Sequence, residues 1–184
     1  GATALPAQAE TLYLKAAKLV DPIGGKLRSK PLITIVDDRM TEVAFGANAP
    51  DNGNVIDLGD APLLPGLADM HTHLTYYSSD NGYDSLAVSY TDQAIRGVAN
   101  ARKTLMAGFT VARNLGAGGF SDVSLRDAID SGRVPGPRLQ VSGPALGITG
   151  GHCDSNLLPE QYEVKAEGVA DGPWAVRAKV REVS

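Results

Sequence analysis

The chain reads Leu63-Leu64-Pro65-Gly66-Leu67-Ala68-Asp69-Met70-His71-Thr72-His73 where an apolar run meets two of its three histidines. A Pro-Gly turn followed by apolar residues predicts a buried β-strand rather than a solvated loop. Because side chains alternate along a strand, Asp69, His71 and His73 are expected on one face. Two such imidazoles can reach one metal ion, with the Asp69 carboxylate orienting a ring. The alternative is a pair of unrelated surface histidines.

Beyond this strand, the sequence alternates between strand and helix patterns. The expected elements are strands over 109–113 and 138–142, and helices over 95–106, over 123–129 and from 173. Gly108 and Gly132 stand where the first two helices should end, and Pro173 is well placed to begin the last. This alternation predicts an α/β fold with a parallel sheet and helices outside it. Periodicity alone leaves open whether the sheet is a barrel or doubly wound.

Residues 11–62 have a different character, with short strand patterns and no cluster of catalytic side chains. The strands are expected over 11–15, 32–36, 40–45 and 55–58. Turn-forming Asn, Asp, Gly and Pro residues separate them. We interpret 11–62 as a small β-domain and 1–10 as a disordered tail.

Composition argues against several classes of partner. The 184 residues carry a net charge of −4, without the basic stripe of a nucleic-acid-binding protein. No apolar run approaches the roughly 20 residues of a membrane helix. The single Cys153 excludes an internal disulfide. We do not expect it to act as a nucleophile with His152, because side chains of sequence neighbours generally point apart.

The first residues bear on localisation. Ala7-Gln8-Ala9 before Glu10 resembles the small-x-small end of a secretory signal, so export or a periplasmic location is one expectation. The charged and apolar parts of such a signal are not present. An Ala-rich tail on a cytoplasmic protein is therefore the alternative.

The histidine strand and three later segments together resemble the amidohydrolase superfamily. The later segments are 107–116, 136–139 and 147–152. As a set they look like the imidazolonepropionase-like branch, which includes Xaa-Pro dipeptidases, related carboxypeptidases and ochratoxin-type amidases. The resemblance covers about residues 10–184, and no single segment would carry it alone.

This resemblance implies a (β/α)8 TIM-like barrel preceded by a small β-sandwich domain over 11–62. Residues 63–184 would then form the first three strand–helix units. A complete barrel has eight such units and about 250 residues. An open three-strand piece would expose an unpaired edge and apolar helix faces. We therefore expect this chain to be the N-terminal portion of a longer polypeptide, with the remaining C-terminal part as its partner.

The resemblance also implies a divalent-metal centre, most simply two Zn²⁺ ions, one of them bound by His71 and His73. The other family ligands are a carboxylated lysine, two histidines and an aspartate on later strands, and we assign none of them here. A metal-activated water would cleave the amide bond of a dipeptide or N-acyl amino acid. Xaa-Pro dipeptides come first among the implied substrates, and ochratoxin-like amides next. Related proteins often form homo-oligomers.

Five further residues are weighed beside the metal pair. His152 follows the third strand, at the end where barrel active sites assemble, and is the candidate catalytic and substrate-binding residue. It would donate a hydrogen bond to the scissile carbonyl or a substrate carboxylate, and the alternative is an ordinary loop histidine. Tyr76 and Tyr77, with Tyr83, could line a substrate pocket or simply pack. Asn114 stands where relatives often carry aspartate, which leaves its role in doubt.

Two other functions stand beside the leading hypothesis. A non-catalytic fragment could bind metal or a partner without turnover, and the incomplete ligand set supports this. A hydrolase of cyclic amides, as in imidazolonepropionase, is the second alternative. Both differ from the leading hypothesis in measurable activity, since only a metal-dependent amidase would lose hydrolysis of linear amides on chelation.

Overall fold

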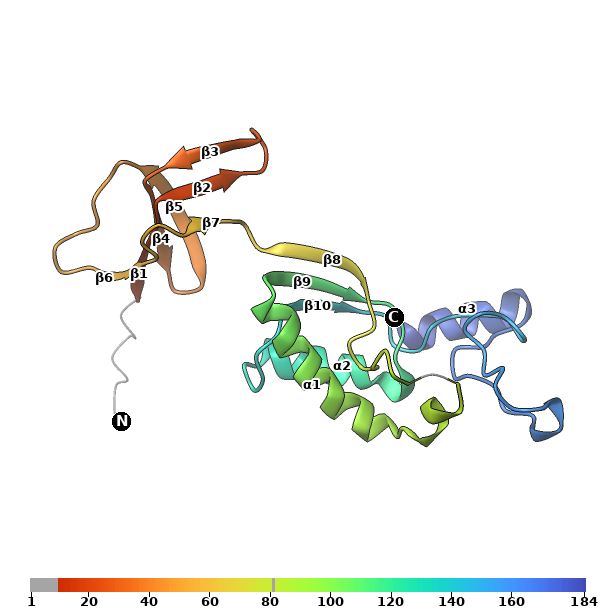
Figure 1. The fold of residues 1–184 in the computed structure, drawn as a ribbon. Coiled ribbons are helices and arrows are strands. Elements are labelled where there is room, and N and C mark those ends of the chain that lie inside the picture. The colour runs from red at the N-terminus through yellow and green to blue at the C-terminus, as the bar shows by residue number, and fades with distance from the viewer. Residues whose placement is uncertain (1–9, 81) are drawn as a thin grey trace, which may run out of the picture. The chain divides into compact units, whose positions relative to one another are not determined.

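A computed structural model describes residues 10–80 and 82–184 (Figure 1). The chain divides into two compact units, one ending at Pro65 and one running from Gly66 to Ser184. The tail expected over 1–10 lies outside the described residues except for Glu10. Within the described ranges, none of the helices has the length and apolar character needed to cross a membrane.

The first unit contains a four-stranded sheet in the order β5-β4-β1-β6. Its strands are β1 (Thr11–Lys15), β4 (Pro31–Val36), β5 (Arg39–Phe45) and β6 (Asn54–Asp57). β1 pairs antiparallel with β4 and parallel with β6. Leu32 and Ile33 on β4 are buried, as the β-branched and aliphatic composition of this run predicts. All four predicted strands are confirmed to within one residue at each end.

A second small sheet, in the order β3-β2-β7, was missed by the sequence analysis. It consists of β2 (Lys18–Asp21), β3 (Lys26–Ser29) and β7 (Pro62–Leu63). The Asp21 carboxylate accepts the backbone N–H groups of Ile23 and Gly24, both at 3.0 Å, and so closes the turn between β2 and β3. Stacking of the two sheets into a sandwich stays a prediction.

The second unit consists of three successive strand–helix pairs. They are β8 (Leu67–Thr72), α1 (Tyr90–Met106), β9 (Phe109–Asn114), α2 (Ser121–Asp130), β10 (Arg138–Val141) and α3 (Gly172–Val183), with short 3-10 helices at Gly82–Ala87, Gly118–Phe120 and Glu160–Tyr162. The strands form a parallel sheet in the order β10-β9-β8. Figure 1 shows α1 and α2 together on one side of this sheet. The predicted α/β alternation is confirmed.

The core of this unit lies between the sheet and the first two helices. Leu74, Ala101, Ala112, Leu125 and Leu139 form one buried cluster. These residues come from the loop after β8, from α1, from β9, from α2 and from β10. The cluster therefore packs β9, β10 and the loop after β8 against the same pair of helices.

The ends of α1 follow the chemistry of its sequence. At its start, Ser89 Oγ accepts the Asp92 N–H at 3.1 Å, a standard N-cap contact. At its end, Gly108 has φ +95° and donates its N–H to the Leu105 carbonyl at 2.9 Å. The left-handed backbone there favours glycine, so the expected helix end is confirmed.

β8 departs from the prediction at its carboxyl end. The sequence predicted a strand running through His73, but β8 ends at Thr72. Its pairing with β9 shifts register between Asp69 and Thr72. His73 therefore lies one residue beyond the regular ladder, where strict alternation of side chains no longer determines its direction.

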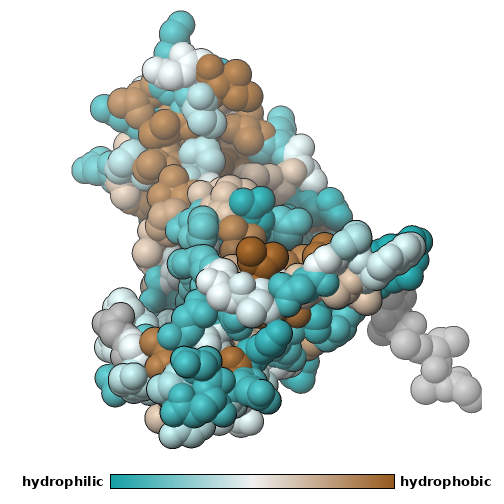
Figure 2. All heavy atoms as spheres, turned by 90° about the vertical axis from the view of Figure 1, so that its right-hand side faces the viewer, coloured by the Kyte–Doolittle hydropathy of each residue, from teal (hydrophilic) through white to brown (hydrophobic). Residues whose placement is uncertain are grey.

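The last helix leaves apolar side chains in contact with solvent. On α3, Trp174 is 77% exposed, and Val176 and Val180 are also exposed. Figure 2 shows apolar atoms gathered in the upper part of its view, with smaller apolar areas among polar atoms below. These three apolar side chains thus lie largely uncovered by the described residues.

Candidate active site

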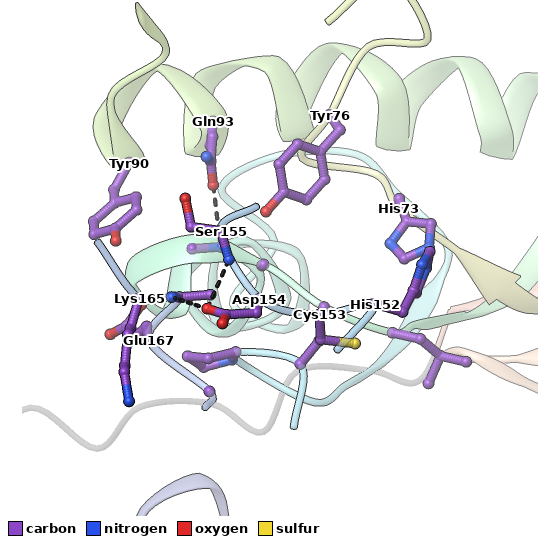
Figure 3. A pocket seen from close by; sticks show the side chains of 18 of the residues that line it. His73, Tyr76, Tyr90, Gln93, His152, Cys153, Asp154, Ser155, Lys165 and Glu167 are labelled. Carbon is purple, nitrogen blue, oxygen red and sulfur yellow. Dashed lines mark hydrogen bonds between the residues drawn. The ribbon is translucent and has the colours of Figure 1, made fainter. Parts of the chain in front are cut away.

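A cavity of about 610 Å³ lies at the carboxyl ends of the three strands. Loops that follow β8, β9 and β10 all contribute to its wall, as does the start of α1. Figure 3 shows His73, Tyr76 and His152 among the side chains around it. In open parallel sheets and barrels, this end of the strands is where ligands bind.

His71 and His73 line this cavity side by side. Their ring centroids are 5.4 Å apart, with planes inclined at 66°. The His73 ring also lies 6.3 Å from that of Tyr76. The Asp69 carboxylate accepts the backbone N–H of His71 at 3.1 Å, and its orientation of an imidazole stays a prediction. Among the described residues, no hydrogen bond engages the imidazole of any of the three histidines.

The two rings fit part of a divalent-metal site. Imidazole nitrogen is a preferred ligand of zinc and similar ions, and both rings face the same cavity. Within the described ranges, however, no group of three or more His, Cys, Asp and Glu residues could hold an ion. The identity of the metal, the number of ions and the ligand role of the pair stay predictions.

His152 reaches the cavity from a loop between β10 and α3. Asp154, two residues later, holds this loop in shape. Its carboxylate accepts backbone N–H groups from Gly150 (2.8 Å), Ser155 (2.7 Å) and Ala166 (3.0 Å). These bonds, the one from Ala166 foremost, lower the pKa of Asp154 below its ordinary value. The catalytic role of His152 stays a prediction.

Three other charged residues between β10 and α3 are also engaged. Asp171 accepts the Thr149 backbone N–H at 2.9 Å and its hydroxyl proton, and the hydroxyl contact is the main cause of its lowered pKa. Lys165 Nζ lies 3.0 Å from Thr149 Oγ1 and 3.8 Å from Asp171 Oδ2. Glu167 accepts the Gly119 N–H at 2.8 Å. These contacts tie the loop to its surroundings.

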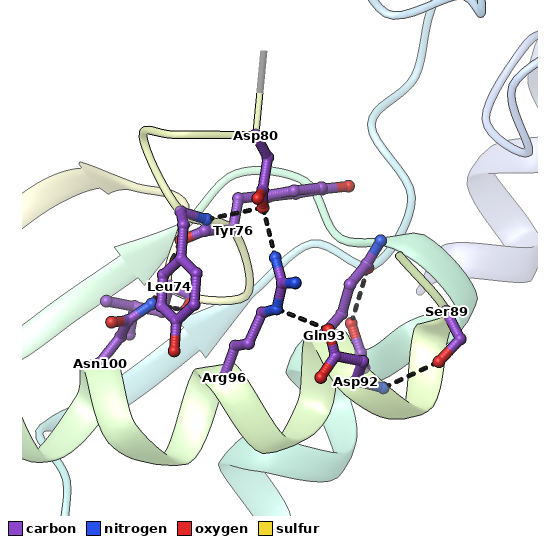
Figure 4. A network of polar contacts seen from close by, with 10 residues as sticks. Leu74, Tyr76, Asp80, Ser89, Asp92, Gln93, Arg96 and Asn100 are labelled. Atoms are coloured by element: carbon purple, nitrogen blue, oxygen red, sulfur yellow. Dashed lines mark hydrogen bonds and ion pairs between the residues drawn. The ribbon is translucent and has the colours of Figure 1, made fainter. Parts of the chain in front are cut away.

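Tyr76 forms part of the wall beside His73. Partial burial raises the pKa of Tyr76 above its ordinary value, so its phenol, already protonated at neutral pH, keeps its proton to higher pH. Asn100 on α1 donates to the backbone carbonyls of Leu74 (2.8 Å) and Tyr76 (3.2 Å), as Figure 4 shows for this side of the loop. The loop after β8 is thereby fixed to α1.

Tyr77 lies outside this cavity, although the sequence analysis paired it with Tyr76. The Arg96 guanidinium stands 4.8 Å above its ring. Arg96 also pairs with Asp80 and Asp92, both at 2.6 Å (Figure 4). Tyr83 is 68% exposed and does not line the cavity either. Substrate contact by these two tyrosines stays a prediction that the cavity does not support.

Two polar residues beneath the cavity received too little weight in the sequence analysis. Asn114 was noted only as a departure from aspartate, and Asp122 was not considered. Both are completely buried. A usable signal existed for Asp122, which sits in the first turn of α2, where the helix dipole favours a carboxylate.

The model of the amidohydrolase family matches residues 63–182. The chain belongs to this family. Ochratoxinase of Aspergillus niger is 32% identical over 134 residues, which make up 66% of this chain and 27% of that protein. The predicted superfamily is thus confirmed by a match that spans the histidine strand and all three strand–helix pairs.

Solved structures agree over nearly the whole chain. A Xaa-Pro dipeptidase with methionine bound in its active site is 34% identical, with a TM-score of 0.83, covering 94% of this chain and 44% of the dipeptidase. A prolidase complexed with N-methylphosphonate-L-proline is 30% identical, with a TM-score of 0.78, covering 94% of this chain and 43% of the prolidase. The chain therefore spans less than half the length of these relatives.

Proposed function

We propose that this chain supplies the first part of the active site of a metal-dependent hydrolase of amide bonds. The observation that carries the proposal is the pair His71 and His73, 5.4 Å apart at a cavity that also receives His152. Membership of the amidohydrolase family supports it, as does similarity to an ochratoxinase and to Xaa-Pro dipeptidases. We favour two Zn²⁺ ions as the cofactor.

Each residue has a distinct part in this proposal. His71 and His73 would hold one divalent ion, which would supply Lewis acidity and an activated water for attack on the amide carbonyl. His152 donates a hydrogen bond to the scissile carbonyl or to a substrate carboxylate. Tyr76, whose phenol is protonated at neutral pH and whose pKa is raised further by burial, offers a phenol proton and an aromatic wall. Hydrogen-bond donors from two different loops thereby orient the substrate.

The cavity lining favours an amide with an apolar or cyclic substituent. Tyr76, Tyr90, Leu115 and Pro144 contribute aromatic and aliphatic surface. Lys165 also lines the cavity, but its ammonium group already contacts the Thr149 hydroxyl and the Asp171 carboxylate. We therefore propose that apolar contacts recognise the substrate side chains. Xaa-Pro dipeptides are the first proposed substrates, and aromatic N-acyl amino acids the second.

The proposal requires further metal ligands. Catalytic zinc sites commonly have three protein ligands, whereas the described residues offer the two imidazoles. We propose that the others come from later strands of a (β/α)8 barrel, of which β8, β9 and β10 are the first three. Those strands and their helices would also cover the exposed apolar side of α3.

The experiment uses the full-length protein and a panel of Xaa-Pro dipeptides and N-acyl amino acids. Chelator-treated protein should lose hydrolysis of linear amides, and Zn²⁺ should restore it. Ca²⁺ is the matched control, because it prefers oxygen ligands and should restore nothing. Full activity of a preparation shown to be free of metal would contradict the proposal, and so would a lack of amide hydrolysis by the zinc-loaded protein.

A further inference from the structure

The main chain beside His73 is held by a buried side chain from the neighbouring strand. β8 ends at Thr72, so His73 is not fixed by the regular ladder. The next residue, Leu74, donates its N–H to Asn114 Oδ1 at 2.7 Å. Asn114 ends β9 and is completely buried. A buried bond of this length restricts the backbone on which the His73 ring is mounted.

The amide group of the same asparagine extends this contact to the loop after β9. Asn114 Nδ2 donates to the Gly116 carbonyl and to Asp122 Oδ2, both at 3.2 Å. Gly116 has φ +122° and lies near the His73 imidazole, since a Cβ built on Gly116 would be 3.9 Å from two atoms of that ring. Asn114 is therefore linked both to the backbone next to His73 and to the loop that lies beside its ring.

Asp122 adds the loop after the third strand. Its Oδ1 accepts the Val123 N–H at 2.9 Å, and its Oδ2 accepts the Gly143 N–H at 3.2 Å. Gly143 in turn accepts the Ala117 N–H through its carbonyl at 3.0 Å. The carboxylate thus joins the loops that follow β9 and β10, without a cation among the described residues beside it.

We propose that Asn114 and Asp122 are positioning residues that set the direction of the His73 imidazole for metal binding. This inference rests on the proposed function. The pair forms a continuous buried bridge among the loops that follow β8, β9 and β10. Residues that orient metal ligands through hydrogen bonds typically change metal affinity by about 10- to 100-fold when replaced. The bridge is the physical substitute for the strand ladder that ends before His73.

The test measures Co²⁺ binding by the full-length protein, with far-UV circular dichroism as the control for folding. Asp122→Asn should weaken Co²⁺ binding about tenfold and alter the visible spectrum of the bound ion. One carboxylate oxygen of Asp122 becomes an NH₂ group, which cannot accept the hydrogen bond that this oxygen receives. The bridge that holds His73 is therefore weakened. Asp127→Asn, an exposed change on the same helix, is the matched control and should bind Co²⁺ within about twofold of the wild type.

The reciprocal swap separates positioning from simple damage. Asn114→Asp alone places two carboxylates together in a buried site and should also weaken binding. Combined with Asp122→Asn, it restores one donor and one acceptor between the two side chains. The double variant should therefore bind Co²⁺ more tightly than the sum of the single effects predicts. If Asp122→Asn fails to fold, recovery of both fold and binding in the double variant still supports the proposal.

Three results would overturn this assignment. The first is wild-type affinity and spectrum in folded Asp122→Asn. The second is a double variant that binds Co²⁺ no more tightly than the sum of the two single effects predicts. The third, a wild-type protein that binds no Co²⁺, would overturn the proposed function itself and this inference with it. The first two outcomes leave the proposed function standing, so the two failures are distinguishable.

Discussion

The polar side chains at the two ends of the cavity differ in whether they already make hydrogen bonds within the protein. At one end, the imidazoles of His71, His73 and His152 make no hydrogen bond to any described residue, although they share the cavity wall. At the other end, Asp154 and Glu167 accept backbone N–H groups. The first set is available for a ligand, whereas the second is occupied in holding loops.

This contrast shows that the number of charged groups around a cavity is a poor guide to its chemistry. A carboxylate that accepts two or three backbone N–H groups shapes the wall, because its lone pairs are already used. An imidazole that faces the cavity without a partner can bind a metal or a substrate.

The largest effect should follow removal of either member of the metal pair. His71→Ala or His73→Ala in the full-length protein should lose bound metal and reduce amide hydrolysis to the detection limit. Metal content by mass spectrometry and kcat/KM are the measurements. Met70→Leu, a change on the same strand, is the matched control and should retain both. Unchanged metal content in either histidine variant would show that the replaced histidine is not a metal ligand.

His152→Ala should have a smaller effect of a different kind. Loss of one hydrogen-bond donor to a reacting carbonyl lowers kcat by about 100-fold in comparable cases, while metal content should be retained. His152→Gln, which keeps an N–H donor, should recover part of the loss. A loss of metal in His152→Ala would show instead that this residue is a ligand.

The loop that Asp154 and Asp171 hold in place, residues 147–171, should have a stability that depends on pH. The pKa values of Asp154 and Asp171 are lowered from 3.8. A lowered pKa means that the stabilisation is fully present above pH 3.8 and is lost as the pH falls through the folded-state value. Hydrogen exchange in residues 147–171, corrected for its intrinsic pH dependence, should therefore rise only below about pH 4.

Asp154→Asn supplies the control for this acid transition. The variant should show faster exchange in the same loop at neutral pH, with a weaker change on acidification. Exchange that rises already between pH 5 and 7 would assign the stability of the loop to a group other than these two carboxylates.

The smallest effect is expected at Glu167. Its carboxylate accepts the Gly119 N–H, and the amide oxygen of Glu167→Gln can accept the same bond. We expect kcat/KM to stay within about threefold of the wild type, which is typical of substitutions that keep local contacts. A loss as large as that of His152→Ala would place Glu167 among the groups that act on the substrate.

Much of the second unit could be predicted because local signals agreed with the fold. Apolar periodicity, Gly108 at the end of α1 and the strand pattern at 109–113 all pointed to the observed elements, although α1 begins at Tyr90, five residues before the predicted start. The histidine pair was also visible, because a two-residue spacing implies neighbouring side chains. In these places, local propensity and long-range packing favour the same structure.

The rest depended on contacts between distant residues. The end of β8 at Thr72 follows from a register shift against β9, which one strand's sequence does not encode. The buried bridge joins Asn114 to Leu74, forty positions earlier. Tyr76 and Tyr77 look equivalent in the sequence, yet only Tyr76 lines the cavity. Tyr77 instead packs its ring against the Arg96 guanidinium. The turn at Asp21 did carry a local signal, in its Asp-Pro-Ile-Gly-Gly sequence, and was overlooked.

The most direct test of the central claim is anomalous diffraction at the zinc absorption edge, from crystals of the full-length protein grown with Zn²⁺. We expect a peak about 2.1 Å from one nitrogen of His71 and one of His73, the usual zinc–imidazole distance. An ordered pair of rings in zinc-soaked crystals with no anomalous peak between them would contradict the claim that they share a metal ion.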